Sequence, residues 1–158
     1  MKYKIGIGYD LHRLVKRRAL VLGGVEVPFG KGLLGHSDGD CLIHAVIDAL
    51  LGGMGLPDIG RTFPDTDPKL EGCRSTDLLE DTAARLKKHK AAVVNIDAVI
   101  IAQEPKLAPY IDNMKGVLAS ALGVAAKDIG LKAKTNEGLG DIGRGRAIAA
   151  WAVVLLKK

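Results

Sequence analysis

Three residues in the first third of the chain have the types and spacing of a metal site. Asp10 and His12 lie two positions apart in the segment YDLHRL, and His44 follows in HSDGDCLIHAVIDALL. Alternate residues of a β-strand point to the same face, so Asp10 and His12 can act together at the end of a strand. One carboxylate and two imidazoles are ligands that Zn²⁺ favours, and three protein ligands leave a fourth position open, as in catalytic sites. The pattern predicts a zinc ion held by these three residues.

The segment GHSDGD, residues 35–40, is a candidate anion site. The pattern predicts a helix that begins near Ser37, and the free N–H groups at a helix amino end attract anions such as phosphate. The imidazole of His36 can add a hydrogen bond. The simpler interpretation is that Ser37 and Asp40 only cap the helix, because they fit the capping-box spacing. Asp40 also lies four residues before His44, so it is a candidate to orient that imidazole.

Two loops rich in glycine or proline carry further candidate residues. Asp65 and Asp67 in FPDTD can hydrogen-bond the hydroxyl groups of a polyol, although solvated turn acids are the simpler interpretation. Glu137 in KTNEGLG can hold a hard cation such as Mg²⁺, which prefers oxygen ligands and substrate phosphates. Lys134 and Thr135 come just before it and can contact phosphate oxygens.

Hydrophobic periodicity predicts the elements that must position these residues. Alternating segments indicate strands, the pair Gly23–Gly24 indicates a hairpin, and apolar residues at helical spacing indicate three helices. The expected strands are 3–10, 92–103, 129–135 and 147–156, the hairpin is 18–30, and the helices lie within 37–53, 75–90 and 106–123. The order predicts an α+β fold with a mixed four-stranded sheet, helices packed on one face and a short hairpin.

No repeat, linker or low-complexity segment divides the chain, so residues 1–158 are expected to form a single domain. The last strand, AIAAWAVVLL, is apolar on both faces and has to be covered on both. Helices on one side of the sheet cover only one of them. This strand therefore hints at a subunit interface.

The composition narrows the class of protein. The chain is 47% hydrophobic and 26% charged, with no apolar run of membrane-spanning length and no signal segment, so no membrane partner and a cytoplasmic location are expected. The basic residues behind the net charge of +5 are scattered and aromatic residues are few, which argues against nucleic acid as a partner. A small acidic substrate such as a phosphate ester explains the charge equally well. Cys41 and Cys73 are expected to be reduced thiols.

Known nucleophile and nucleotide motifs are missing, since the chain has neither a P-loop pattern nor a G-x-S-x-G elbow. The residues alone therefore predict a zinc-dependent enzyme that acts on a phosphorylated small molecule, with a second metal as an option.

Longer segments resemble those of one enzyme family. GIGYDLHRL, LGGVEVP, KGLLGHSDGDCLIHAVIDALLG, PDIGRTFPDTDP, IIAQEPKLAPYI and KAKTNEGLGDIGRGRAIA occur in the expected order over nearly the whole chain. Together they resemble the 2-C-methyl-D-erythritol 2,4-cyclodiphosphate synthase family of the non-mevalonate isoprenoid pathway. The resemblance implies conversion of 4-diphosphocytidyl-2-C-methyl-D-erythritol 2-phosphate into the cyclic diphosphate with release of CMP. It also implies a homotrimer with active sites between subunits, one zinc per subunit and a second divalent ion, Mg²⁺ or Mn²⁺.

The resemblance also implies roles for individual residues. Zinc would be bound by Asp10, His12 and His44, the second ion would be placed by Glu137, and the transition state would be stabilised by His36 and Thr135. The phosphate and methylerythritol parts of the substrate would lie against Asp10, His12, His36, Ser37, Asp58, Gly60, Phe63, Asp65 and Asp67. The cytidine pocket would consist of Ala102, Pro105, Lys106 and Leu107, joined by Lys134, Thr135, Asn136 and Glu137 from a neighbouring subunit. Arg144 would keep a cationic site in the trimer channel.

A few positions depart from the family pattern. Asp141 stands where many relatives carry an aromatic residue, Arg146 where many carry Glu, and Tyr9 where Phe is frequent. All three are expected to face the central channel of the trimer, where some members bind isoprenoid diphosphates. Lys134 replaces a small hydroxyl residue.

Two other functions compete with the cyclising reaction. One is a metal-dependent phosphodiesterase or pyrophosphatase that acts on a nucleotide-linked polyol with water as the nucleophile. The other is a trimer that binds nucleotides or isoprenoids without catalysis.

Overall fold

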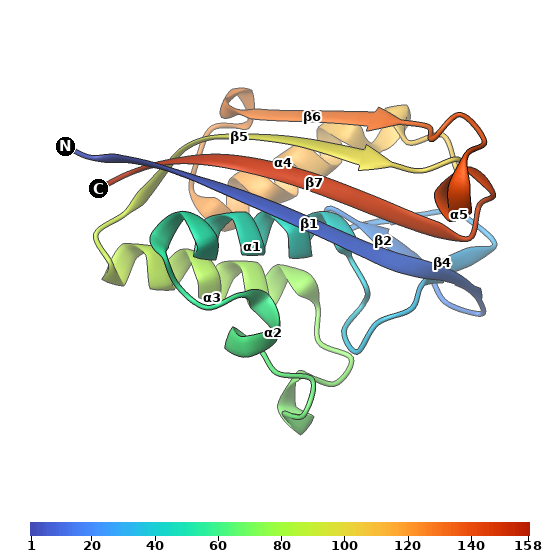
Figure 1. Ribbon diagram of the computed structural model, residues 1–158, viewed down its shortest axis with the longest axis horizontal. Coiled ribbons are helices and arrows are strands. Elements are labelled where there is room, and N and C mark those ends of the chain that lie inside the picture. Colours follow the sequence, from blue (N-terminus) through green and yellow to red (C-terminus); the bar gives the residue numbers. More distant parts are fainter.

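The computed structural model describes residues 1–158 as two sheets with helices along one side (Figure 1). The strands are β1 (Tyr3–Lys16), β2 (Leu20–Leu22), β3 (Val25–Val27), β4 (Lys31–Leu33), β5 (Ala92–Ile101), β6 (Ile129–Lys134) and β7 (Ala147–Lys157). The α-helices are α1 (Cys41–Met54), α2 (Ile59–Thr62), α3 (Ser75–Lys88), α4 (Ile111–Leu122) and α5 (Gly140–Gly143). Short 3-10 turns lie at Pro68–Leu70, Ala108–Tyr110 and Ala126–Asp128. None of the helices is long and apolar enough to cross a membrane.

The main sheet has the strand order β4-β1-β7-β5-β6. Only β5 and β6 are parallel, and they are joined through α4, whereas the other pairs are antiparallel. The predicted α+β class with a mixed sheet is confirmed. The sheet has five strands where the sequence indicated four, because the three-residue β4 pairs with the end of β1 through Leu14 and Leu33. The predicted hairpin is the separate sheet of β2 and β3, turned by Gly23 and Gly24, both with positive φ.

The sheet buries one face and leaves the other open. The inner face, the helices and the hairpin share one hydrophobic core, to which α1 contributes most of its side chains. On the opposite side, large apolar side chains of β1 and β7 are 43–73% exposed. We call this surface the outer sheet face; it consists of Tyr3, Ile5, Ile7, Tyr9, Leu11, Trp151 and Val153. The last strand is apolar on both sides, as predicted. Its inner side is buried, and on its outer side Ala147 and Ala149 are buried whereas Trp151 and Val153 are exposed.

Helix α1 lies directly on the backbone of β1, because β1 has glycine where the two elements meet. A Cβ atom built on Gly8 would lie 1.9 Å from the carbonyl oxygen of Ala45, and one on Gly6 would lie 1.8 Å from that of Ala49. The small residues on both sides thus allow a contact that larger side chains would prevent. Asp10 and His12 continue the same face of β1, so they meet the amino-terminal end of α1.

The ends of the helices differ from the sequence prediction in three places. Helix α1 begins at Cys41 with Asp40 as its N-cap, and Ser37 lies outside it. It continues through Gly52–Gly53 and ends at Gly55, which has the left-handed conformation that favours glycine at a C-cap. Helix α3 is not capped by the side chain of Ser75. The predicted end of α4 at Gly123 is confirmed.

Asp40 joins the hairpin to α1. One of its carboxylate oxygens accepts hydrogen bonds from the backbone N–H groups of Gly23 and Ile43, and the other accepts one from Gly24. Its complete burial raises the pKa of the carboxyl to about 6, against the lowering effect of these donors. Asp40 makes no contact with His44 through its side chain, so the prediction that it orients that imidazole is wrong.

Replacing Gly8 with Ala is expected to destabilise the fold, since the added Cβ overlaps the carbonyl of Ala45. Overpacking of this kind typically costs about 1–3 kcal/mol. Gly116 in α4 is the matched control, because a Cβ built there would meet no atom within 4 Å apart from its chain neighbours and the backbone of its own helix. Gly116→Ala should stabilise the protein by about 0.5–1 kcal/mol. Urea unfolding of both variants measures the difference, and equal stabilities would contradict the close contact.

Candidate active site

The side chains of Asp10, His12 and His44 converge at the contact between β1 and α1. Nε2 of His12 lies 2.8 Å from Oδ2 of Asp10, Nδ1 of His44 lies 3.1 Å from the same oxygen, and the two nitrogens are 3.2 Å apart. Tetrahedral ligands at about 2.0–2.2 Å from a zinc ion lie roughly 3.3–3.6 Å from one another. The three atoms therefore form a triangle close to the size that one divalent metal ion requires.

The hydrogen bonds of the two imidazoles select the tautomers that a metal needs. Nδ1 of His12 lies 2.5 Å from the carbonyl oxygen of Leu34, which can only accept, so Nδ1 carries the proton and Nε2 keeps its lone pair. Nε2 of His44 lies 2.9 Å from the hydroxyl oxygen of Ser75, which leaves Nδ1 to face Asp10. Both free lone pairs thus point at the same place as the carboxylate.

The protonation of the triad reflects its partial burial. Burial alone raises the pKa of the Asp10 carboxyl, but the hydrogen bonds and charges of His12 and His44 outweigh it and hold that pKa well below its usual range. Burial lowers the pKa of His12, and the neighbouring Asp10 reverses this, so the net shift is upward. Protons and a cation compete for the same atoms, and metal occupancy should fall as the pH drops.

Two residues of the triad, His12 and His44, line a cavity of about 290 Å³. Several residues predicted to hold the substrate line it as well: His36, Ser37, Gly60, Phe63 and Asp65. Nε2 of His36 is buried and makes no hydrogen bond within the chain, so it is available to a ligand in the cavity. Cys73, Leu70 and Leu78 complete an apolar side.

Two predicted acids of this region have a structural contact instead of a place in the cavity wall. Oδ1 of Asp58 accepts a hydrogen bond from the N–H of Arg61 and caps α2. Oδ1 of Asp67 accepts one from the N–H of Lys69 and caps a 3-10 turn. At the amino end of α1, where an anion site is predicted, the N–H of Ile43 is already bonded to Asp40 and is not free for an anion.

The second group of predicted residues lies elsewhere in the same chain. The segments 102–107 and 134–137 follow the parallel strands β5 and β6 and are joined by a hydrogen bond from the N–H of Ala102 to the carbonyl of Lys134. Lys106, Thr135 and Glu137 are exposed, and the hydroxyl of Thr135 donates to the carboxylate of Glu137 over 3.1 Å. The two segments therefore lie side by side and form a second surface in one chain, which corrects the expectation that residues 134–137 join 102–107 from a neighbouring subunit. Ala102 and Leu107 are themselves buried in the core.

This second surface is separated from the triad by the width of the sheet. Asp10 pairs with Ala150, Ala150 with Ile100, and Ile100 with Ala133 on β6. Three strand spacings amount to roughly 14 Å. Glu137 accordingly does not belong to the metal-binding group of Asp10, His12 and His44.

The comparison with known families agrees with this geometry. A model of the YgbB family matches residues 3–157. The chain belongs to the YgbB family. Its members include a 2-C-methyl-D-erythritol 2,4-cyclodiphosphate synthase from Caldicellulosiruptor bescii, which is 51% identical over 154 residues, 98% of each chain.

Solved structures of the same family share the fold. A 2C-methyl-D-erythritol-2,4-cyclodiphosphate synthase described as the CDP-bound form superimposes with a TM-score of 0.90 at 40% identity, over 98% of this chain and 100% of that one. The bifunctional IspDF of Campylobacter jejuni matches with a TM-score of 0.95 at 38% identity. That match covers 99% of this chain but 42% of the bifunctional one, so the chain spans less than half of that relative.

Three positions that depart from the family pattern lie together. Tyr9, Asp141 and Arg146 line a second concave surface at the end of β1 and β7, of about 730 Å³. The guanidinium of Arg146 is 3.3 Å from the carboxylate of Asp141, and the ring of Tyr9 packs on Trp151 with centroids 4.5 Å apart. Arg144, by contrast, is an exposed residue at the end of α5.

The sequence did not indicate the residues that hold His44 and the loop of His36 in place. Arg18 donates hydrogen bonds to the carbonyls of Gly35 and Ser37, and these bonds hold the loop that carries His36. Ser75 is hydrogen-bonded both to Asp38 and to His44. Nothing in the spacing of these residues indicates the contacts, since each joins segments far apart in the chain.

We expect the protein to bind one equivalent of a divalent metal ion through the triad. His12→Ala should remove most of this binding, because two ligands cannot replace three. His89→Ala is the matched control, since His89 lies at the carboxyl end of α3, away from the triad. Titration of the metal-free proteins with Co²⁺ or Zn²⁺ measures the stoichiometry. Equal binding by the His12 and His89 variants would contradict the site.

Proposed function

We propose that this chain converts 4-diphosphocytidyl-2-C-methyl-D-erythritol 2-phosphate into 2-C-methyl-D-erythritol 2,4-cyclodiphosphate and CMP, as a phosphorus–oxygen lyase of isoprenoid biosynthesis. One observation carries the proposal. His12 and His44 of the metal-binding triad line a cavity that is also lined by His36, whose buried Nε2 has no partner in the protein. The synthase names of relatives more than half identical, and the CDP-bound form of a structural neighbour, support the same reaction.

The cavity suits one end of this substrate. His36 can donate a hydrogen bond from Nε2 to a phosphate oxygen, and the hydroxyl of Ser37 lies beside it. Asp65 offers a carboxylate to the hydroxyl groups of the methylerythritol part, against the apolar side formed by Phe63 and Leu78. The narrow volume of about 290 Å³ holds a small polyol phosphate and leaves the nucleotide outside.

The chemistry requires positioning more than activation. The attacking group is the substrate's own 2-phosphate, which is already an anion, so its attack on the β-phosphorus, with CMP as the leaving group, needs no general base. We propose zinc at Asp10, His12 and His44 and Mg²⁺ or Mn²⁺ near Glu137; such ions, when bound, neutralise phosphate charge and that of the departing CMP. Well-oriented intramolecular attack reaches effective molarities of about 10⁵ M or more.

The nucleotide end of the substrate is assigned to the second surface. Lys106 and the segment that begins at Ala102 would contact the cytidine, with Pro105 and Leu107 shaping the turn. Lys134, Thr135 and Asn136 would contact the diphosphate, and Thr135 already donates to Glu137. Since the width of the sheet separates this surface from the triad, we propose that each complete site combines the triad of one subunit with the second surface of its neighbour.

A homotrimer is part of the same proposal, and the outer sheet face supports association of subunits. Seven large apolar side chains of β1 and β7 form this face, and their exposure in one chain is 43–73%. Paired residues such as Ile7 and Val153 make it continuous. An apolar surface of this kind on a sheet usually marks a protein interface. The cytoplasmic location and the reduced state of both cysteines remain predictions from the sequence.

The reaction is tested by following the named substrate with ³¹P NMR. We expect the cyclic diphosphate and CMP to appear together. His44→Ala should lower the rate by roughly 10³-fold or more, since metal-ion charge stabilisation is worth several kcal/mol. His89→Ala should react like the wild type. An open phosphate monoester in place of the cyclic product would contradict the proposal and support the competing phosphodiesterase.

The assembly is tested by placing a charge on the outer sheet face. Ile7 is 64% exposed in one chain, and Ile7→Asp should dissociate the trimer because the carboxylate would be buried between subunits. Asn113→Asp adds the same charge on the exposed part of α4 and should leave the trimer intact. Light scattering after size-exclusion chromatography gives the masses. A monomeric wild type, or a trimeric Ile7→Asp variant, would rule out this interface.

A further inference from the structure

His44 faces two different environments with its two ring nitrogens. Nδ1 points to Asp10 and His12, whereas Nε2 lies 2.9 Å from the hydroxyl oxygen of Ser75 and 3.2 Å from that of Ser37. A neutral imidazole carries one proton. Nδ1 can present a lone pair to a metal only if that proton stays on Nε2, and this requires an acceptor beside Nε2.

Ser75 can serve as that acceptor because it donates its own hydroxyl proton to another residue, Asp38. Its hydroxyl donates to Oδ1 of Asp38, and its backbone N–H donates to Oδ2 of the same carboxylate over 2.9 Å. Asp38 thus holds Ser75 at two points and directs the hydroxyl proton away from His44. The lone pairs of the Ser75 oxygen are left for the N–H of His44.

Ser37 is the weaker partner of the two. Its oxygen lies farther from Nε2 than that of Ser75 does, and it already accepts a hydrogen bond from the N–H of Gly39 over 3.2 Å. Ser37 also lines the substrate cavity, where its hydroxyl is available to a ligand. Its bond to His44 is therefore not exclusive.

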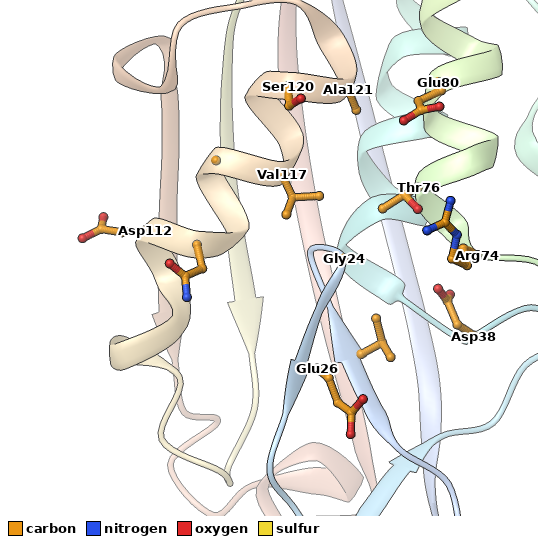
Figure 2. A pocket seen from close by; sticks show the side chains of 13 residues that line it. Gly24, Glu26, Asp38, Arg74, Thr76, Glu80, Asp112, Val117, Ser120 and Ala121 are labelled. Carbon is orange, nitrogen blue, oxygen red and sulfur yellow. The ribbon is translucent and has the colours of Figure 1, made fainter.

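Ser75 and Asp38 lie on the side of His44 that faces away from the metal site, and neither residue lines the substrate cavity. Ser75 is fully buried and does not line that cavity. Asp38 reaches it from the other side, at the wall of a separate groove between α3, α4 and the hairpin (Figure 2). Figure 2 shows its carboxylate near the start of α3, below Arg74 and Thr76. The guanidinium of Arg74 pairs with Asp77 over 2.6 Å.

We infer that Ser75, held by Asp38, is a positioning residue that keeps the proton of His44 on Nε2 and turns Nδ1 toward the metal. The inference rests on the proposed metal site at Asp10, His12 and His44. Ser75 is the first residue of α3, and its position in the sequence predicts only a helix cap. The inference gives it a role at the metal site instead. Partners of this kind behind a ligating histidine are typically worth 10–100-fold in metal affinity.

The test compares Ser75→Ala with Thr82→Val, which removes another fully buried hydroxyl from the same helix. The hydroxyl of Thr82 donates to the carbonyl of Leu78 and has no contact with the triad. Zinc affinity is measured by competition with a chelator, and the His44 tautomer by long-range ¹H–¹⁵N NMR of the metal-free proteins. Ser75→Ala should bind zinc about 10-fold more weakly, since Ser37 replaces part of the contact. It should also lose the uniform Nε2–H tautomer, whereas Thr82→Val should change neither.

The outcomes separate the inference from the function on which it rests. A Ser75→Ala variant that keeps the zinc affinity and tautomer of the wild type overturns the inference alone. A wild type that binds no zinc overturns the metal site as well. If Ser75→Ala does not fold, Asp38→Asn takes its place, because the amide supports the Ser75 hydroxyl less strongly than a carboxylate. A weakened affinity in that variant then supports the inference, and an unchanged one overturns it.

Discussion

The direct contact of α1 with the backbone of β1 is the constraint on which the site depends. It exists because β1 has Gly6 and Gly8 opposite the carbonyls of Ala49 and Ala45, where any Cβ would overlap an oxygen. The alternation of the strand then brings the next two inner residues, Asp10 and His12, to the amino-terminal part of the helix. His44 directly precedes Ala45, so a ligand of the metal-binding triad and a residue of the close packing contact are neighbours on α1.

The segments before α1 and α3 turn this contact into a cavity. The loop of residues 35–38 is held by Arg18 on one side and by hydrogen bonds to residues 72–75 on the other. The carboxylate of Asp48 on α1 accepts the N–H of Ile59 over 2.7 Å and holds α2, which carries Gly60, against the same space. The triad and the cavity walls therefore depend on one set of contacts, and a disturbance of α1 would affect metal and substrate together.

The two faces of the main sheet have different roles. The inner face builds the core and the metal site, while the outer sheet face stays apolar and open within one chain. The residues proposed to contact the nucleotide follow β5 and β6, which lie two and three strands away from β1. The proposed association through the outer sheet face would bring the triad of one subunit next to the second surface of another.

The sequence by itself determined the longer elements, the α+β class and the identity of the three candidate ligands, because hydrophobic period, glycine turns and the D-x-H spacing are local properties. It also carried the family motifs from which the reaction is proposed. It did not determine all the contacts of Asp40 and Ser75: Asp40 caps α1 as predicted but also binds the hairpin, whereas Ser75, predicted to cap α3, supports His44 instead. Only the tertiary structure decided these contacts and the separation of Glu137 from the triad, because they join segments far apart in the chain and follow from how the helices and strands pack, which no local pattern encodes.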